Sequence, residues 1–185
     1  MGRAAAGDEA AFVALVERVL PRLLGYFRRL GADAATAEDC AQEVLFRLYR
    51  TRERYRPEAR FLTFLFHVAR NHWIDVYRHA RVGPRTVSAD APADRDGGPL
   101  SADLAGPSPA PGEGADRRAL GAALERAVAD LGEEHRDVFV LAQVEGLRYP
   151  DVAAILRIPV GTVKSRMHAA VRLLREALRR AGFEP

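Results

Sequence analysis

The segment from Gly161 to Arg180 carries polar and basic side chains whose spacing suits nucleic-acid recognition. At 100° per residue, one arc of a helix holds Lys164, Ser165, His168 and Arg172. The opposite arc is apolar, and its members are Val163, Met167, Ala170, Val171, Leu174 and Leu178. A helix divided in this way can bury one face and present the other face to a partner.

The chemistry of the polar arc matches the groups that duplex DNA exposes. A helix fits the major groove, where Lys164, Ser165 and His168 can hydrogen-bond base edges. Arg166 and Arg172 are better placed for phosphates, which supply affinity and register. The first turn, which includes Thr162, offers backbone N–H groups that favour a further phosphate.

A short helix predicted from Asp151 to Leu156 precedes this segment, and the tight connection 157–160 joins the two. This arrangement is typical of a helix-turn-helix. Periodicity alone leaves a solvated basic helix as an equal alternative. The short preceding helix favours DNA binding.

Three histidines raise the possibility of a metal site or an enzyme. His67 and His72 are five residues apart, so a helix places them on different faces. His72 and His79 share a face, but we expect the acid between them, Asp75, to pair with Arg78 rather than to complete a metal site. The chain also lacks a Gly-rich phosphate loop and a nucleophile elbow. We therefore expect no enzyme activity, no metal and no cofactor, and we expect Cys40 to be a small core residue.

Helical patterns flank a central segment that is poor in large apolar residues. The chain has 185 residues and 11 prolines, and six of these prolines lie between Arg81 and Gly114. Such a segment cannot bury enough surface to offset its ordering entropy, so we interpret it as a flexible linker. The sequence thus predicts an all-α protein with two small helical domains, residues 1–80 and 115–185, joined by the linker 81–114. Within the first domain, Pro21 is expected to kink or split a helix.

Charge is distributed unevenly along the chain. The net charge is only +3, but residues 160–180 carry six cations and one acid, whereas residues 88–116 carry six acids and one cation. This asymmetry makes a polyanion a plausible partner for the basic C-terminal end. The acidic segment is a candidate shield that covers the basic face before the partner binds. The N-terminus lacks a basic stretch before an apolar run, and no segment approaches 18 uninterrupted apolar residues. We expect a cytoplasmic protein without membrane insertion.

Two separate stretches resemble one family. The stretch EGLRYPDVAAILRIPVGTVKSRMHAAVRLLRE (145–176) resembles region 4 of the extracytoplasmic-function (ECF) sigma factors of the bacterial sigma-70 family. AEDCAQEVLFRLYR (37–50) is similar to their region 2.2, and RFLTFLFHVARNHWIDVYR (60–78) to their −10-reading helix. The occurrence of both motifs, in this order and on either side of a linker, is highly specific for this family.

The resemblance implies roles for individual residues. Asp39, Gln42 and Glu43 match the triplet that contacts core RNA polymerase, and Arg47 lies on the same side of that helix. Tyr55 and Asn71 match positions that help to hold a flipped −10 base. The other candidate −10 contacts are Arg56, Arg60, Phe64 and Arg78. We expect Trp73 to belong to the core, whereas Phe64 fits either a core or a stacking role.

The resemblance also implies the function and the partners. The chain would bind the clamp helices and flap of bacterial core RNA polymerase, recognise the −35 and −10 promoter DNA elements and promote initiation, and an anti-sigma factor is a possible partner. Three departures stand out: Phe64 replaces the usual Trp, Arg157 occupies a turn position where Gly or a small polar residue is common, and Ala169 stands where some relatives carry Arg. The rival interpretation, a conventional helix-turn-helix regulator, leaves residues 37–78 unexplained.

Overall fold

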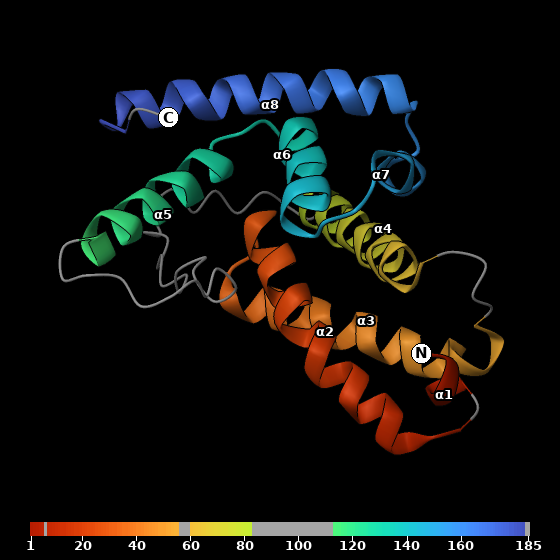
Figure 1. Ribbon diagram of the computed structural model, residues 1–185. Helices are drawn as coiled ribbons and strands as arrows, with labels where there is room; N and C mark the ends of the chain where they lie inside the picture. The colour runs from red at the N-terminus through yellow and green to blue at the C-terminus, as the bar shows by residue number, and fades with distance from the viewer. Residues whose placement is uncertain (6, 56–59, 83–112, 184–185) are drawn as a thin grey trace.

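The computed structural model describes residues 1–5, 7–55, 60–82 and 113–183 of the chain. Within these residues every regular element is helical (Figure 1). The all-α prediction is therefore confirmed. The linker predicted over 81–114 lies mostly outside the described residues.

The N-terminal half contains helices α1 to α4. These are α1 (Gly2–Ala5), α2 (Glu9–Arg29), α3 (Ala34–Thr51), the short 3₁₀ helix η1 (Arg52–Arg54) and α4 (Phe61–Val82). Asp8 and Asp33 cap α2 and α3, because their carboxylates accept hydrogen bonds from the N–H groups of Ala11 (2.9 Å) and Thr36 (2.7 Å). These hydrogen bonds hold the pKa of both carboxyls below the ordinary value.

Pro21 does not split α2, so of the two predicted effects the split is wrong, while the kink stays a prediction. The helix runs continuously from Glu9 to Arg29 with Pro21 inside it, and Pro21 is exposed. Proline removes one backbone hydrogen bond, but at an exposed position water can satisfy the freed carbonyl. Apolar residues of α2 are buried both before and after the proline in the sequence, and this packing stabilises a continuous helix.

The C-terminal half is built around its last helix. It contains α5 (Glu113–Ala129), α6 (Glu133–Phe139), the π-helical turn η3 (Val140–Val144), α7 (Tyr149–Leu156) and α8 (Val160–Arg180). Helix α8, at the top of Figure 1, packs across α5, α6 and α7. These contacts bury the apolar arc of α8.

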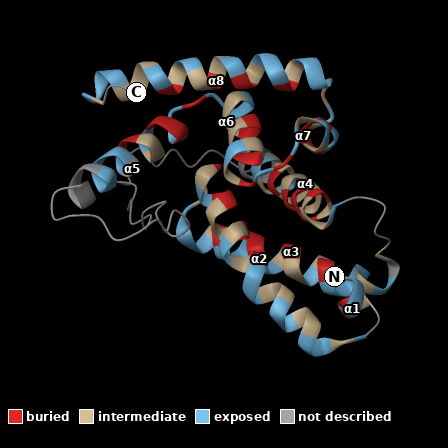
Figure 2. Ribbon diagram, viewed as in Figure 1, coloured by how far each residue is buried: buried red, intermediate tan, exposed pale blue. Residues whose placement is uncertain are grey.

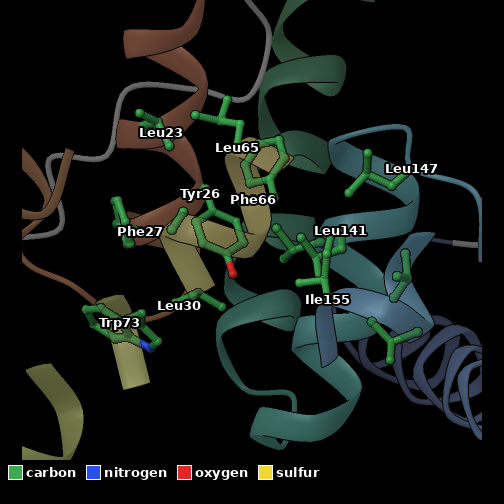
Figure 3. Close-up of a cluster of buried hydrophobic side chains, with 14 of the residues drawn as sticks. Leu23, Tyr26, Phe27, Leu30, Leu65, Phe66, Trp73, Leu141, Leu147 and Ile155 are labelled. Atoms are coloured by element: carbon green, nitrogen blue, oxygen red, sulfur yellow. The ribbon is translucent and has the colours of Figure 1, made fainter. Parts of the chain in front are cut away.

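The two halves pack against each other. Helix α4 contacts α7 and α2 contacts α5, and one continuous cluster of buried apolar residues extends through both halves (Figure 2). Tyr26, Phe66, Leu141 and Ile155 lie together in this cluster (Figure 3). The linker composition had suggested separate modules, so this contact is a finding of the structure.

Aromatic packing dominates the core of the N-terminal half. Phe27 is fully buried, with ring centroids 5.4 Å from Tyr26 and 6.0 Å from Trp73. Trp73 is 8% exposed, which confirms its expected place in the core. Cys40 is buried as expected, and burial raises the pKa of its thiol.

Replacing Phe27 by alanine should remove this packing and leave a cavity. We expect Phe27→Ala to lower the free energy of unfolding by about 3–5 kcal/mol in urea denaturation. Val13 lies on the same helix but is 57% exposed, so Val13→Ala should change it by no more than about 0.5 kcal/mol. Equal effects of the two substitutions would contradict the placement of Phe27.

Candidate functional site

The turn between α7 and α8 has the backbone geometry that the helix-turn-helix requires. Arg157 ends α7 in the left-handed region, with φ 55° and ψ 45°, and is the one non-glycine residue of the described chain with positive φ. Its N–H and that of Ile158 donate to the carbonyl of Ala153. This conformation explains why glycine suits the position, since a side chain there costs about 1–2 kcal/mol.

Helix α8 separates its two faces as the spacing predicts. Val163, Met167, Ala170 and Leu174 are buried against the helices below. Lys164, Ser165, His168 and Arg172 are all exposed. The face that can read base edges is therefore open to solvent.

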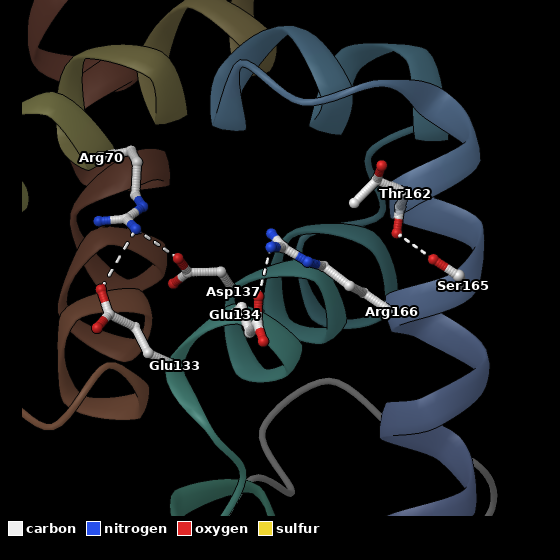
Figure 4. Close-up of polar contacts among 7 residues, drawn as sticks. All are labelled: Arg70, Glu133, Glu134, Asp137, Thr162, Ser165 and Arg166. Carbon is white, nitrogen blue, oxygen red and sulfur yellow. Dashed lines mark hydrogen bonds and ion pairs between the residues drawn. The ribbon is translucent and has the colours of Figure 1, made fainter.

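Two predicted contact residues on α8 already have partners within the protein. Arg166 forms an ion pair with Glu134 of α6, and the Ser165 hydroxyl donates to the carbonyl of Thr162 at 3.1 Å (Figure 4). The N–H of Thr162 donates to the carbonyl of Pro159 at 2.9 Å. At least one N–H group at the N-terminus of α8 is therefore already hydrogen-bonded within the protein and is not free to bind a phosphate.

A shallow hollow runs beside the exposed face of α8. Its lining combines apolar and charged side chains, and the residues are Gln143, Tyr149, Met167, His168, Val171, Arg172, Arg175, Glu176 and Arg179. His168 and Arg172 belong to the polar arc that the spacing along α8 predicted. Gln143 and Tyr149 were missed, because they reach α8 only through the tertiary fold.

Helix α3 presents the residues expected to contact polymerase. Asp39 and Gln42 are exposed, and Glu43 forms a half-exposed ion pair with Arg47 at 2.7 Å. Phe46 lies on the same side, 54% exposed, with the Arg50 guanidinium 5.6 Å from its ring centroid. The buried residues of α3, such as Cys40 and Val44, face the core instead. Phe46 is therefore a large exposed apolar group within a polar surface.

Aromatic side chains gather where the chain enters α4. The ring centroid of Tyr55 lies 5.4 Å from that of Phe64 and 6.3 Å from that of Phe61. Phe64 and Asn71 are seven residues apart on α4, so they share a face about 10 Å apart along the axis. Arg60 is exposed at the start of this helix. The structure thus brings Tyr55 and Phe64 together near the start of α4, where Arg60 is exposed, while Arg56 and the side chain of Arg78 lie outside what it describes.

Buried ion pairs join the two halves, and the sequence did not predict them. Arg22 of α2 donates to the carboxylate of Glu145 at 3.0 Å and to its backbone carbonyl at 2.8 Å. Arg70 of α4 lies 2.5 Å from Asp137 and 3.5 Å from Glu133, both on α6 (Figure 4). The Glu145 and Asp137 side chains are only 3% and 4% exposed. The partners are far apart in sequence, so no local pattern reveals them.

Burial outweighs the arginines in setting the protonation of these two carboxyls. Desolvation raises the pKa of Asp137 to about 6, although the Arg70 charge opposes the shift. Burial also raises the pKa of Glu145, against the opposing effect of Arg22. Near neutral pH, burying these two carboxylates between the halves therefore lowers the free energy of unfolding through their desolvation.

Comparison with known proteins identifies the two halves. Residues 15–82 match the family described as Sigma-70 region 2, and residues 121–174 match Sigma-70, region 4. The chain is 38% identical to the ECF RNA polymerase sigma factor SigL of Mycobacterium tuberculosis, covering 97% of this chain and 95% of that protein. It is 34% identical to the RNA polymerase sigma factor CarQ of Myxococcus xanthus, covering 93% and 91%.

Solved structures show the same fold. The sigma factor RpoE of Bartonella quintana, in complex with the anti-sigma factor NepR, superposes with a TM-score of 0.67 at 23% identity, covering 91% of this chain and 97% of that chain. CnrH, in complex with the cytosolic domain of CnrY, gives a TM-score of 0.63 at 23% identity, covering 96% and 94%.

The matched regions and the relatives define a promoter-recognising transcription initiation factor. The chain belongs to the sigma-70 family of RNA polymerase sigma factors, in its ECF group. In the part of the chain that the structure describes, no helix is long and apolar enough to cross a membrane.

The raised pKa of Asp137 predicts how stability depends on pH. A carboxyl with a raised pKa in the folded state contributes stability that is complete below its ordinary value of 3.8 and is lost as the pH rises through about 6. Between pH 7.5 and 4.5, wild type should therefore gain about 2 kcal/mol of unfolding free energy relative to Asp137→Asn, which cannot titrate at this position.

Urea denaturation of both proteins across this pH range measures the difference. The raised pKa of Glu145 and the capping carboxylates are common to both proteins and largely cancel. Parallel pH profiles would show that Asp137 is not buried as described.

Proposed function

We propose that the exposed face of α3 docks this sigma factor on the clamp helices of core RNA polymerase. Asp39, Gln42 and the Glu43–Arg47 pair form a polar row on this face, with Phe46 exposed beside them. A large apolar side chain within a polar rim is typical of a protein–protein contact. The family resemblance assigns the same residues to polymerase docking.

The −35 element is read by α8. The observation that carries this assignment is the division of α8 between its buried face and the exposed Lys164, Ser165 and His168. These side chains donate to or accept from base edges, while Arg172 contacts phosphate. Arg166 and Thr162 hold the helix in place through Glu134 and Pro159, and can add backbone contacts at the edge of the groove.

The −10 element is opened and held at the start of α4. Tyr55 and Phe64 offer aromatic faces on which an unpaired base can stack, and Asn71 offers an amide that can hydrogen-bond it. Arg60 is positioned for the strand backbone, and Arg56 and Arg78 are assigned the same role from the sequence.

The two halves act as modules, residues 1–80 and 115–185, connected by the linker 81–114. Binding of one module to polymerase or promoter raises the effective concentration of the other. Polymerase performs the chemistry, so the chain has no catalytic step of its own and works in the cytoplasm, where polymerase is found. Further partners are the polymerase flap and an anti-sigma factor. The solved relatives RpoE and CnrH were captured with the anti-sigma factor NepR and the cytosolic domain of CnrY, respectively.

Docking is tested by run-off transcription with bacterial core polymerase on fragmented genomic DNA. Wild type should direct transcripts from discrete sites that share −35 and −10 elements. Asp39→Ala combined with Gln42→Ala should abolish them, because the polar row loses its central contacts. Glu38→Ala, exposed on the same helix, is the control and should leave transcription unchanged. Initiation that does not depend on the protein, with tight duplex binding by the protein alone, would indicate a conventional regulator.

Base reading is tested by promoter binding of the reconstituted holoenzyme. Each base contact is worth about 1–3 kcal/mol, so Lys164→Ala and His168→Ala should each weaken binding about 5- to 150-fold. Each should also relax the preference at one −35 position. Arg118→Ala removes an exposed cation of α5 and is the matched control. A uniform loss across all −35 substitutions would show that these side chains contact only phosphate.

A further inference from the structure

The chain between α3 and the proposed −10 site is short and hydrogen-bonded to itself. Helix η1 begins directly after α3, and Tyr55 follows as its C-cap residue. The N–H of Tyr55 donates to the carbonyl of Arg52 at 3.2 Å. The backbone of Tyr55 is therefore fixed relative to Arg52, so the groups that hold Arg52 also determine the position of Tyr55.

The side chain of Arg52 is held at the end of α3. Its Cζ lies 3.8 Å from the centroid of the Tyr49 ring, and its Nη1 donates to the Tyr49 carbonyl at 2.7 Å. Its Nη2 lies 3.4 Å from the Glu53 carboxylate, and the side chain is only 22% exposed. A guanidinium over an aromatic face is attracted by the ring quadrupole, and its hydrogen bond to the carbonyl is charge-assisted. Both Nη atoms of Arg52 thus have partners within the protein.

The Tyr49 ring is fixed in turn by α2. Its centroid lies 5.2 Å from that of Phe12, and the two rings are inclined at 67°, an edge-to-face arrangement that aromatic pairs prefer. Arg52, Tyr49 and Phe12 thus form a continuous set of contacts, which we call the Arg52 brace. The brace connects the first turn of α2 to η1 and so to the chain that precedes Tyr55.

Helix α1 supports the brace from the N-terminus. It contacts both α2 and η1 (Figure 1), and its Ala4 is only 1% exposed. Arg3 of α1 forms an ion pair at 2.7 Å with Asp8, the N-cap residue of α2. The first residues of the chain therefore pack against the element that leads to Tyr55, although they are about 50 positions away from it in the sequence.

Beyond the brace lies the aromatic group at the start of α4, where the ring centroids of Tyr55 and Phe64 are 5.4 Å apart. A binding site works when surrounding residues hold its side chains within about 0.5 Å of their productive positions. Tyr55 follows a short 3₁₀ helix and lies outside α4, so the position of its ring depends on such support. The Arg52 brace provides this support from the N-terminal side.

We propose that Arg52 is a positioning residue for −10 recognition. Together with Tyr49 and Phe12 it holds Tyr55 against Phe64, and it does not itself contact DNA. This role rests on the proposed function, in which Tyr55 holds an unpaired −10 base. Arg52 differs from exposed Arg60 in that its guanidinium is engaged within the protein.

The brace is tested by the binding of −10 oligonucleotides to the reconstituted holoenzyme. The probes are a single strand that carries the −10 element of a promoter found by run-off transcription, and the same strand with an abasic site at each −10 position in turn. Stacking of one base strengthens binding by about 5- to 150-fold, so the ratio of the dissociation constants for abasic and intact strands reports how well that base is held.

Arg52→Ala and Tyr49→Ala should each lower this ratio several-fold at the position where it is largest in wild type. Tyr49→Phe keeps the ring that Arg52 and Phe12 contact, so it should retain the wild-type ratio. Arg18→Ala removes an exposed cation of α2 and is the matched control. Binding of a duplex that carries only the −35 element should be unchanged in every variant, which separates a local effect from a loss of folding.

The position of the Tyr55 ring is measured without DNA by fluorine NMR of the full-length chain labelled with fluorotyrosine. The chain has five tyrosines, and Tyr55→Phe assigns the Tyr55 resonance. Arg52→Ala should shift or broaden this resonance, because the ring loses its support. Arg18→Ala should leave it unchanged.

Each outcome decides the proposal. If Arg52→Ala weakens binding of intact and abasic strands equally and makes the salt dependence shallower, Arg52 contacts phosphate and the proposal is wrong. It is also wrong if Arg52→Ala matches Arg18→Ala, or if Tyr49→Phe behaves like Tyr49→Ala. A wild type that binds intact and abasic strands equally refutes the proposed role of Tyr55 instead. The fluorine spectra then decide separately whether Arg52 holds the Tyr55 ring.

Discussion

Helix α4 is buried on two sides at once, and the arrangement of the whole molecule depends on this. On one side it packs against α3 within the N-terminal half, and on the other side it meets α7 of the C-terminal half. Leu65, Phe66 and Ala69 on this helix have no exposed surface. The same helix carries Phe64 and Asn71. The element proposed to read the −10 DNA therefore also packs against the apolar residues of both halves. The position of α4 is therefore coupled to that of the C-terminal half, which carries the helix proposed to read the −35 element.

The elements that the sequence predicted well were those set by local periodicity. Val163, Met167, Ala170 and Leu174 of the apolar arc of α8 lie in the core and its polar arc is exposed, because a helix with one such stripe buries that side. Arg157 stood out in the sequence as an unusual turn residue, and its left-handed backbone supplies the physical reason. The helix-turn-helix was predictable for the same reason: both of its helices and the turn lie within 32 residues, 149–180.

The contact between the halves was not predictable in this way. Asp137 and Glu145 look like solvated acids in a helical stripe, and only tertiary packing reveals that Arg70 and Arg22 face them. The split predicted at Pro21 does not occur for a related reason, since the packing of α2 against its neighbours holds the helix together across the proline. Arg70 and Asp137 are separated by 67 positions in the sequence, and Arg22 and Glu145 by 123. Pairs this far apart produce no pattern in the local spacing of residues.

One further consequence follows from the exposed Lys164 on α8. The chain has 28 Lys+Arg residues, and Lys164 is the single lysine among them. Arginine keeps its charge under all physiological conditions, whereas the lysine amine can be acylated, which removes its charge. All side-chain amine chemistry of this protein thus falls on the exposed polar face of α8, which we propose reads DNA. Acylation would therefore remove charge from the α8 face that we propose reads the −35 element, and from none of the arginines proposed to contact polymerase or the −10 element.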